Sequence, residues 1–160
     1  MTTGEPDSKG KDPGFPYNLP IWRRSFQLKS PDGMMEARIS QATEASMGNP
    51  TVGTLELSNG FVLNRCNPSF IWSDDSRYLA VPRYFTRFAL FRRQHLLLID
   101  VVDGCVFTSS KSACYFQPES FRDGKLVVIE EPQSDAIRHE WHIPRELDQF
   151  KLTTENLKKS

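Results

Sequence analysis

Hydrophobic and polar residues alternate over short runs along most of this chain. In segment 54–58, Leu55 and Leu57 alternate with polar residues, which predicts a strand with one buried face. Segment 96–99 is apolar at every position, which predicts a central strand covered on both faces. Residues typical of turns separate the runs. The pattern therefore predicts an all-β chain with antiparallel sheets.

The spacing of these runs gives the expected elements. The predicted strands are 24–29, 35–41, 51–58, 61–65, 69–73, 77–82, 94–101, 104–109, 113–117, 125–130 and 136–143. Segment 30–33, Ser-Pro-Asp-Gly, favours a type I turn. Asn59-Gly60 and Asp103-Gly104 favour type I′ hairpin turns. Segment 144–150 begins with proline and predicts a short C-terminal helix.

The pattern of strands and turns recurs after about 44 residues. Asn59-Gly60 and Asp103-Gly104 lie 44 positions apart, and Asp32 and Asp75 lie 43 positions apart. A third, less regular unit follows in 113–152. A period of this length is typical of stacked or radially arranged β units, and it predicts about three of them.

One copy of the repeat resembles a known architecture. Segment 70–81, Phe-Ile-Trp-Ser-Asp-Asp-Ser-Arg-Tyr-Leu-Ala-Val, resembles the first two strands of a WD-repeat-like β-propeller blade. Segment 98–104 resembles the third strand and the turn into the fourth. The Gly-His and Trp-Asp signatures of WD repeats are absent. The resemblance implies a propeller-related fold, or a curved open sheet or sandwich, because three blades are too few to close a ring.

Length and composition predict a single domain. The chain has 160 residues, of which 38% are hydrophobic, enough for one stable core. Residues 1–20 are rich in proline and glycine, so we expect a disordered or draped N-terminal arm. We expect an all-β domain over 21–152 and a frayed tail over 153–160.

Charge and cysteine content favour a cytoplasmic protein. Lysine plus arginine equals aspartate plus glutamate at 20 each, so there is no overall charge to attract nucleic acid or a membrane. Cys66, Cys105 and Cys114 are odd in number and lack C-x-x-C spacing, which favours free thiols in a reducing compartment. No apolar signal segment or stretch long enough to cross a membrane occurs in the sequence.

The most distinctive local composition lies in segment 82–95. It combines four arginines with four aromatic residues, a mixture enriched in protein-binding surfaces. The predicted partner-binding residues are Arg83, Tyr84, Arg87, Phe88, Phe91, Arg92 and Arg93. The alternatives are a long strand pair with Phe88 and Phe91 in the core, and a surface that stacks on single-stranded nucleic acid.

Catalytic and metal-binding patterns are weak. His139 and His142 would point to opposite sides of a strand, so no metal site is predicted there. No nucleophile elbow or phosphate-binding glycine loop occurs, and no cofactor is expected. The leading hypothesis is a non-enzymatic protein-binding module such as an inhibitor, an adaptor or an immunity protein. A monomer is favoured over a homo-oligomer, which exposed sheet edges could form. The alternatives are a hydrolase that uses Asp75, Asp100 or His95, and a single-stranded nucleic-acid binder.

Overall fold

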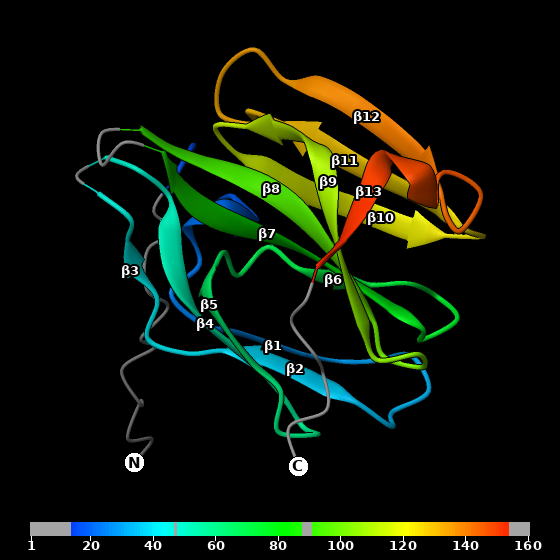
Figure 1. Cartoon of the computed structure of the whole chain (residues 1–160). Helices are drawn as coiled ribbons and strands as arrows, with labels where there is room; N and C mark the ends of the chain where they lie inside the picture. Colours follow the sequence, from blue (N-terminus) through cyan, green and yellow to red (C-terminus); the bar gives the residue numbers. More distant parts are fainter. Residues whose placement is uncertain (1–13, 47, 88–90, 154–160) are drawn as a thin grey trace, which may run out of the picture.

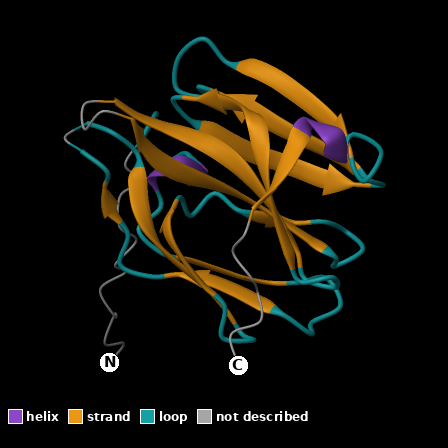
Figure 2. Ribbon diagram, viewed as in Figure 1, coloured by secondary structure: helices purple, strands orange, loops and turns teal. Residues whose placement is uncertain are grey.

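The chain forms an all-β structure of antiparallel sheets (Figures 1 and 2). The computed structural model describes residues 14–46, 48–87 and 91–153, without the side chains of 86, 87, 91, 92 and 153. Most of the expected N-terminal arm, up to residue 13, and the expected tail from 154 onward lie outside these residues. The large sheet is open, because its end strands β1 and β13 do not pair with each other.

The first group of strands is an antiparallel meander. It contains β1 (Phe26–Lys29), β2 (Glu36–Ile39), β4 (Thr51–Leu57) and β5 (Val62–Cys66), with the short β3 (Thr43–Glu44) beside β4. A one-turn 3-10 helix, η1 (Pro20–Trp22), precedes it. Among the described residues, the ladder between this group and the next has one residue pair, Cys66 of β5 opposite Arg83 of β7.

The second and third groups complete the chain. The second contains β6 (Ile71–Trp72), β7 (Tyr78–Arg87), β8 (Phe91–Asp100) and β9 (Cys105–Ala113). The third is a separate three-stranded sheet of β10 (Phe116–Arg122), β11 (Lys125–Glu130) and β12 (Ile137–His142). After the 3-10 turn η2 (Leu147–Gln149), the chain returns to add β13 (Phe150–Thr153) to the edge of β9.

These groups lie in three layers, with the β7–β8 pair in the middle (Figure 1). Odd-numbered residues such as Leu97 and Ile99 enter one hydrophobic core, shared with β2, β4 and β5. Even-numbered residues such as Leu96 and Leu98 enter a second core, shared with β10, β11 and β12. All four are at most 2% exposed, which confirms the prediction of a central strand covered on both faces.

The turns that begin at Ser30 and Ser73 occupy equivalent positions in the predicted repeat, and they have the same hydrogen bonds. In the first, the Ser30 hydroxyl donates to Oδ1 of Asp32 and accepts from the Met35 N–H. In the second, the Ser73 hydroxyl donates to Oδ1 of Asp75 and accepts from the Tyr78 N–H. Each serine carbonyl also accepts a bond from the residue three positions on, as the expected turn at 30–33 requires.

These turns contact one another across the layers. The Asp32 N–H donates to the Ser76 hydroxyl, 2.9 Å away and 44 residues along the chain. The Asp74 N–H donates to the Phe121 carbonyl, and the Asp123 N–H donates to the Asp74 carboxylate. A turn from each group is thereby fixed to the next at one end of the strands.

Other turn and strand predictions are wrong in detail. Gly60 and Gly104 have positive φ, but the residues before them do not, so neither loop is type I′. Both central residues have positive φ at Asp123-Gly124, the two-residue loop between β10 and β11. The expected helix at 144–150 is only the single 3-10 turn η2. The prediction missed β3 and β13, and its strand at 113–117 spans the break between β9 and β10.

Candidate functional site

The segment with arginine and aromatic residues forms the outer half of the β7–β8 hairpin. The two strands pair at ten positions, from Tyr78 opposite Asp100 to Arg87 opposite Phe91. The predicted strands ended at 82 and began again at 94, whereas β7 and β8 continue through the described part of this segment, as the alternative of a long strand pair predicted. Because side chains alternate along a strand, the hairpin has two different faces in this region.

One face presents four half-buried residues, which we call the Arg/aromatic patch: Arg83, Phe85, Arg93 and His95. Arg83 lies opposite His95, and Phe85 lies opposite Arg93. The Phe85 and His95 rings stack across the diagonal with their centroids 4.4 Å apart. The two arginines occupy the other diagonal, on either side of the ring pair.

Hydrogen bonds to the neighbouring strands β5 and β9 hold three side chains of the patch in place. Nε of Arg93 donates to the Ser112 hydroxyl at 3.2 Å, and a terminal nitrogen of Arg93 donates to the Ser112 carbonyl at 3.1 Å. Nε of Arg83 donates to the Asn64 carbonyl at 3.0 Å. The His95 ring places Nδ1 3.3 Å from the Lys111 carbonyl, an acceptor, so Nδ1–H donates. These bonds orient the Arg93 guanidinium and the Nε–H of Arg83.

The structure separates the predicted binding residues. Arg83 and Arg93 belong to the patch, whereas Tyr84 lies on the opposite face, 3% exposed, with its hydroxyl donating to the Pro50 carbonyl. Tyr84 is therefore a packing residue, because alternation turns it away from its neighbours. For Arg87, Phe91 and Arg92 only the strand backbone is described, and Phe88 lies outside the described residues.

Phe85 was not among the predicted partner-binding residues, and His95 was named only for hydrolysis, although both belong to the patch. A signal for both was present. Continuing the period of two outward from the buried Leu79 and Leu97 places Phe85 and His95 on the same face as Arg83 and Arg93. Composition alone drew attention to the segment but did not divide it between its faces.

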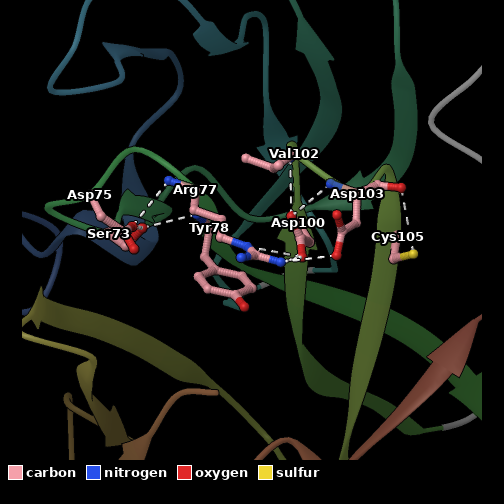
Figure 3. Close-up of polar contacts among 8 residues, drawn as sticks. All are labelled: Ser73, Asp75, Arg77, Tyr78, Asp100, Val102, Asp103 and Cys105. Carbon is pink, nitrogen blue, oxygen red and sulfur yellow. Dashed lines mark hydrogen bonds and ion pairs between the residues drawn. The ribbon is translucent and has the colours of Figure 1, made fainter.

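The two acidic residues proposed for hydrolysis, Asp75 and Asp100, accept hydrogen bonds that stabilise turns (Figure 3). The Asp100 carboxylate is 3% exposed and accepts from Nε of Arg77 at 3.2 Å and from a terminal nitrogen at 2.9 Å. Its other oxygen accepts the N–H groups of Val102 and Asp103. In Asp75, Oδ1 accepts from Ser73 and from the Arg77 N–H. These contacts account for both acids as structural groups.

The pKa values of Arg77 and Tyr78 are shifted by a hydrogen bond and by burial, respectively. The hydrogen bond to Asp100 raises the pKa of Arg77, which keeps the guanidinium charged. Burial raises the pKa of the Tyr78 phenol, so the phenol stays neutral. General acid–base catalysis favours a group whose pKa lies near neutral pH. The pKa shifts of Arg77 and Tyr78 both go upward, away from neutral pH.

A second polar cluster lies between β9 and β12. Nε2 of His139 lies 2.6 Å from the Glu130 carboxylate, and the Lys111 ammonium lies 3.6 Å from the same carboxylate. His139 and Lys111 line a cavity of about 520 Å³ together with Trp141 and Gln149. In the part of the chain that the structure describes, no three His, Cys, Asp or Glu side chains group as a metal site requires.

Two further findings concern the chain as a whole. Among residues 14–46, 48–87 and 91–153, no helix has the length and apolar character needed to span a membrane. Comparison of the chain with protein-family models, curated proteins and solved structures finds no match.

Proposed function

We propose that the chain is a non-enzymatic protein-binding module and that the Arg/aromatic patch is its contact surface. The observation that carries the proposal is the arrangement of the patch. Two oriented arginines flank one stacked ring pair on the outer half of a continuous hairpin. An inhibitor, an adaptor or an immunity protein would use such a surface.

The side chains of the patch lose little conformational freedom when a partner binds, because contacts within the chain already order them. Arginine and aromatic residues dominate the binding energy of protein interfaces because they bury large areas with planar groups. Here the bonds from Arg93 to Ser112 and the stacking of Phe85 on His95 already restrict the side chains before a partner arrives. A preorganised surface loses less conformational entropy on binding.

We further propose that the fold consists of three blade-like units related to those of a β-propeller. The units are 26–66, 71–113 and 116–142. The matching turns at Ser30 and Ser73 support the proposal, as do the two four-stranded meanders and the two cores between successive layers. Exposed residues of the outer layers are mainly polar, for example Arg38 and Glu56 in the first unit and Arg138 and Glu140 in the third.

We propose a cytoplasmic, monomeric state. The three cysteines are free thiols, with Cys66 buried and the other two half-buried, which fits a reducing compartment. The polar outer layers offer little apolar area for a second copy, and apolar area is what stabilises most obligate dimers.

Affinity capture with defined variants tests the proposed function. Immobilised wild-type chain and the Arg83→Ala/Arg93→Ala variant are compared for recovery of bound protein from an extract of the source cells. The matched control is Arg38→Ala/Arg138→Ala, which removes two exposed arginines from the outer layers. We expect the patch variant to lose a protein that the wild type and the control retain. Equal recovery by all three would contradict the proposal.

A further inference from the structure

A groove of about 360 Å³ lies where the first strands of the three groups meet, and we call it the β6 groove. It is lined by β6, by the end of β1 with the turn that follows, and by β10 (Figure 1). Its apolar lining includes the half-buried Leu28 and Ile71. Its charged lining residues have both signs: Lys29, Asp74, Glu119 and Arg122. Because neither sign dominates, charge alone does not select a ligand for this groove.

On the β1 side, the backbone of Lys29 points away from its own sheet. Lys29 lies opposite Glu36 of β2. The N–H and the carbonyl of Glu36 both bond to Ser58, on the far side of β2 from β1. Opposite residues in an antiparallel pair alternate between bonded and non-bonded pairs. The N–H and the carbonyl of Lys29 therefore lie on the open edge of β1, beside the β6 groove.

The equivalent residues of the other two groups have the same orientation. The Ser73 N–H donates to the Tyr78 carbonyl at 2.8 Å, so the backbone groups of the preceding Trp72 point away from β7. The Phe121 carbonyl accepts from the Asp74 N–H at 3.0 Å, so the backbone of Phe121 points away from β11. Lys29, Trp72 and Phe121 all line the β6 groove, which is thus bordered by three strand edges.

One of these edges lacks a bond that its neighbour has. Asp74 follows Ser73 in the second turn, and its N–H bonds to Phe121 of the next group. Pro31 occupies the same position in the first turn and also lines the β6 groove. Proline has no N–H, so Pro31 cannot make the equivalent bond to the Trp72 carbonyl. A buried or half-buried carbonyl gains free energy from any donor that reaches it.

We propose that an extended segment of a partner protein binds in the β6 groove and donates a main-chain N–H to the Trp72 carbonyl. Extended peptides add to open strand edges through main-chain hydrogen bonds, and pockets for alternate side chains give specificity. Here an apolar side chain of the segment would lie on Leu28 and Ile71. This second binding surface goes beyond the proposed function, because it shares no residue with the Arg/aromatic patch.

A titration followed by the backbone amide signals of the chain in NMR spectra tests the proposal. The probes are four acetylated and amidated pentapeptides of the sequence Ser-Val-Xaa-Val-Ser, in which Xaa is alanine, valine, leucine or phenylalanine. We expect saturable shifts of the Lys29 and Trp72 signals, with tighter binding for the larger apolar side chains. The same peptides with N-methylated central amides have no donor at these positions and should not bind.

Replacement of Pro31 restores the missing donor within the chain. In Pro31→Ala, the new N–H can bond to the Trp72 carbonyl as Asp74 bonds to Phe121, and it competes with the peptide. We expect binding to weaken about fivefold, as for the loss of one hydrogen bond. The control is Met34→Ala in the same turn, where the side chain is 82% exposed, and it should bind like the wild type. Thermal unfolding verifies that both variants are folded.

Three results would overturn the proposal. They are the absence of saturable shifts with all four peptides, equal affinity of Pro31→Ala and the wild type, and equal binding of the N-methylated peptides. The last result would indicate a groove for small apolar molecules instead. The Arg83→Ala/Arg93→Ala variant should bind the peptides like the wild type. A failed titration therefore leaves the proposed function standing, and a failed affinity capture leaves the β6 groove standing.

Discussion

The backbone N–H of Asp32 donates to the hydroxyl of Ser76 at 2.9 Å, and this bond joins two turns with the same internal hydrogen bonds. Ser76 has a φ of 65°, in the left-handed region that glycine favours, and Gly33 occupies the equivalent position of the first turn. Serine therefore accepts a strained conformation here, and its hydroxyl supplies a contact between layers that glycine could not make.

Replacement of Ser76 should separate these two effects. We expect Ser76→Ala to lower the free energy of unfolding by about 1 kcal/mol, because it removes a hydrogen bond and keeps the strained φ. The loss should be smaller for Ser76→Gly, since glycine relieves the strain. Urea unfolding measures both, with Ser134→Ala at an exposed position as the control. A larger loss for glycine than for alanine would contradict this account.

Gly53 allows close packing inside the first layer. A Cβ at this position would lie 2.7 Å from Cγ2 of Ile39 and 3.2 Å from Cβ of Ala42. We expect Gly53→Ala to lower the unfolding free energy by about 1–3 kcal/mol, because these buried neighbours would have to move. The exposed Thr54→Ala serves as a control on the same strand. If both variants unfold at the same urea concentration, the packing argument fails.

The Arg77 ion pairs should contribute unequally to stability. The Asp100 side chain is 3% exposed, whereas that of Asp103 is 62% exposed. We expect Asp100→Asn to destabilise the fold by about 2 kcal/mol, as for a hydrogen bond between charged groups. Asp103→Asn should cost less than about 0.5 kcal/mol because water screens the pair. Denaturant unfolding measures the stability of both variants. A greater loss of unfolding free energy in Asp103→Asn than in Asp100→Asn would contradict the burial argument.

Asp32 should make stability depend on pH in the acid range. The hydrogen bond from Ser30, followed by that from the Met34 N–H, lowers the pKa of the Asp32 carboxyl below its ordinary value. Because the folded pKa lies below the unfolded one, the contribution to stability is present above the unfolded pKa. It disappears as pH falls through the folded pKa.

An NMR titration of the Asp32 carboxyl carbon measures this shift. We expect a midpoint below the ordinary aspartate value in the wild type and a return toward that value in Ser30→Ala. In Asp32→Asn, stability should change less between neutral and acid pH than in the wild type. A wild-type midpoint at or above the ordinary value would show that the turn hydrogen bonds do not act on this carboxyl.

The sequence predicted the elements of this fold better than their pairing. Local alternation was sufficient for β4, and the apolar run was sufficient for the two-sided burial of β8. The return of β13 to β9 depends on a partner about 40 residues earlier, which local pattern cannot indicate. The turns at Asn59 and Asp103 also contained the expected residues but adopted other loop types, because loop length decides the turn.

The candidate site could be predicted only in part. Composition located segment 82–95, but it assigned Tyr84 to the surface although its ring packs against the fold. The distinction depends on extending the strand period of two through 82–95, which the alternative of a long strand pair implied but the list of binding residues did not use.

Hydrogen–deuterium exchange of the chain, alone and with its captured partner, tests the central claim most directly. The account predicts slower exchange of backbone amides in the described part of 83–95 and at Ser112 when the partner is bound, because these amides lie in and beside the Arg/aromatic patch. Exchange in β12, on the outer layer, should not change. Protection confined to β12 or to the turns at Ser30 and Ser73, with the hairpin unchanged, would contradict it.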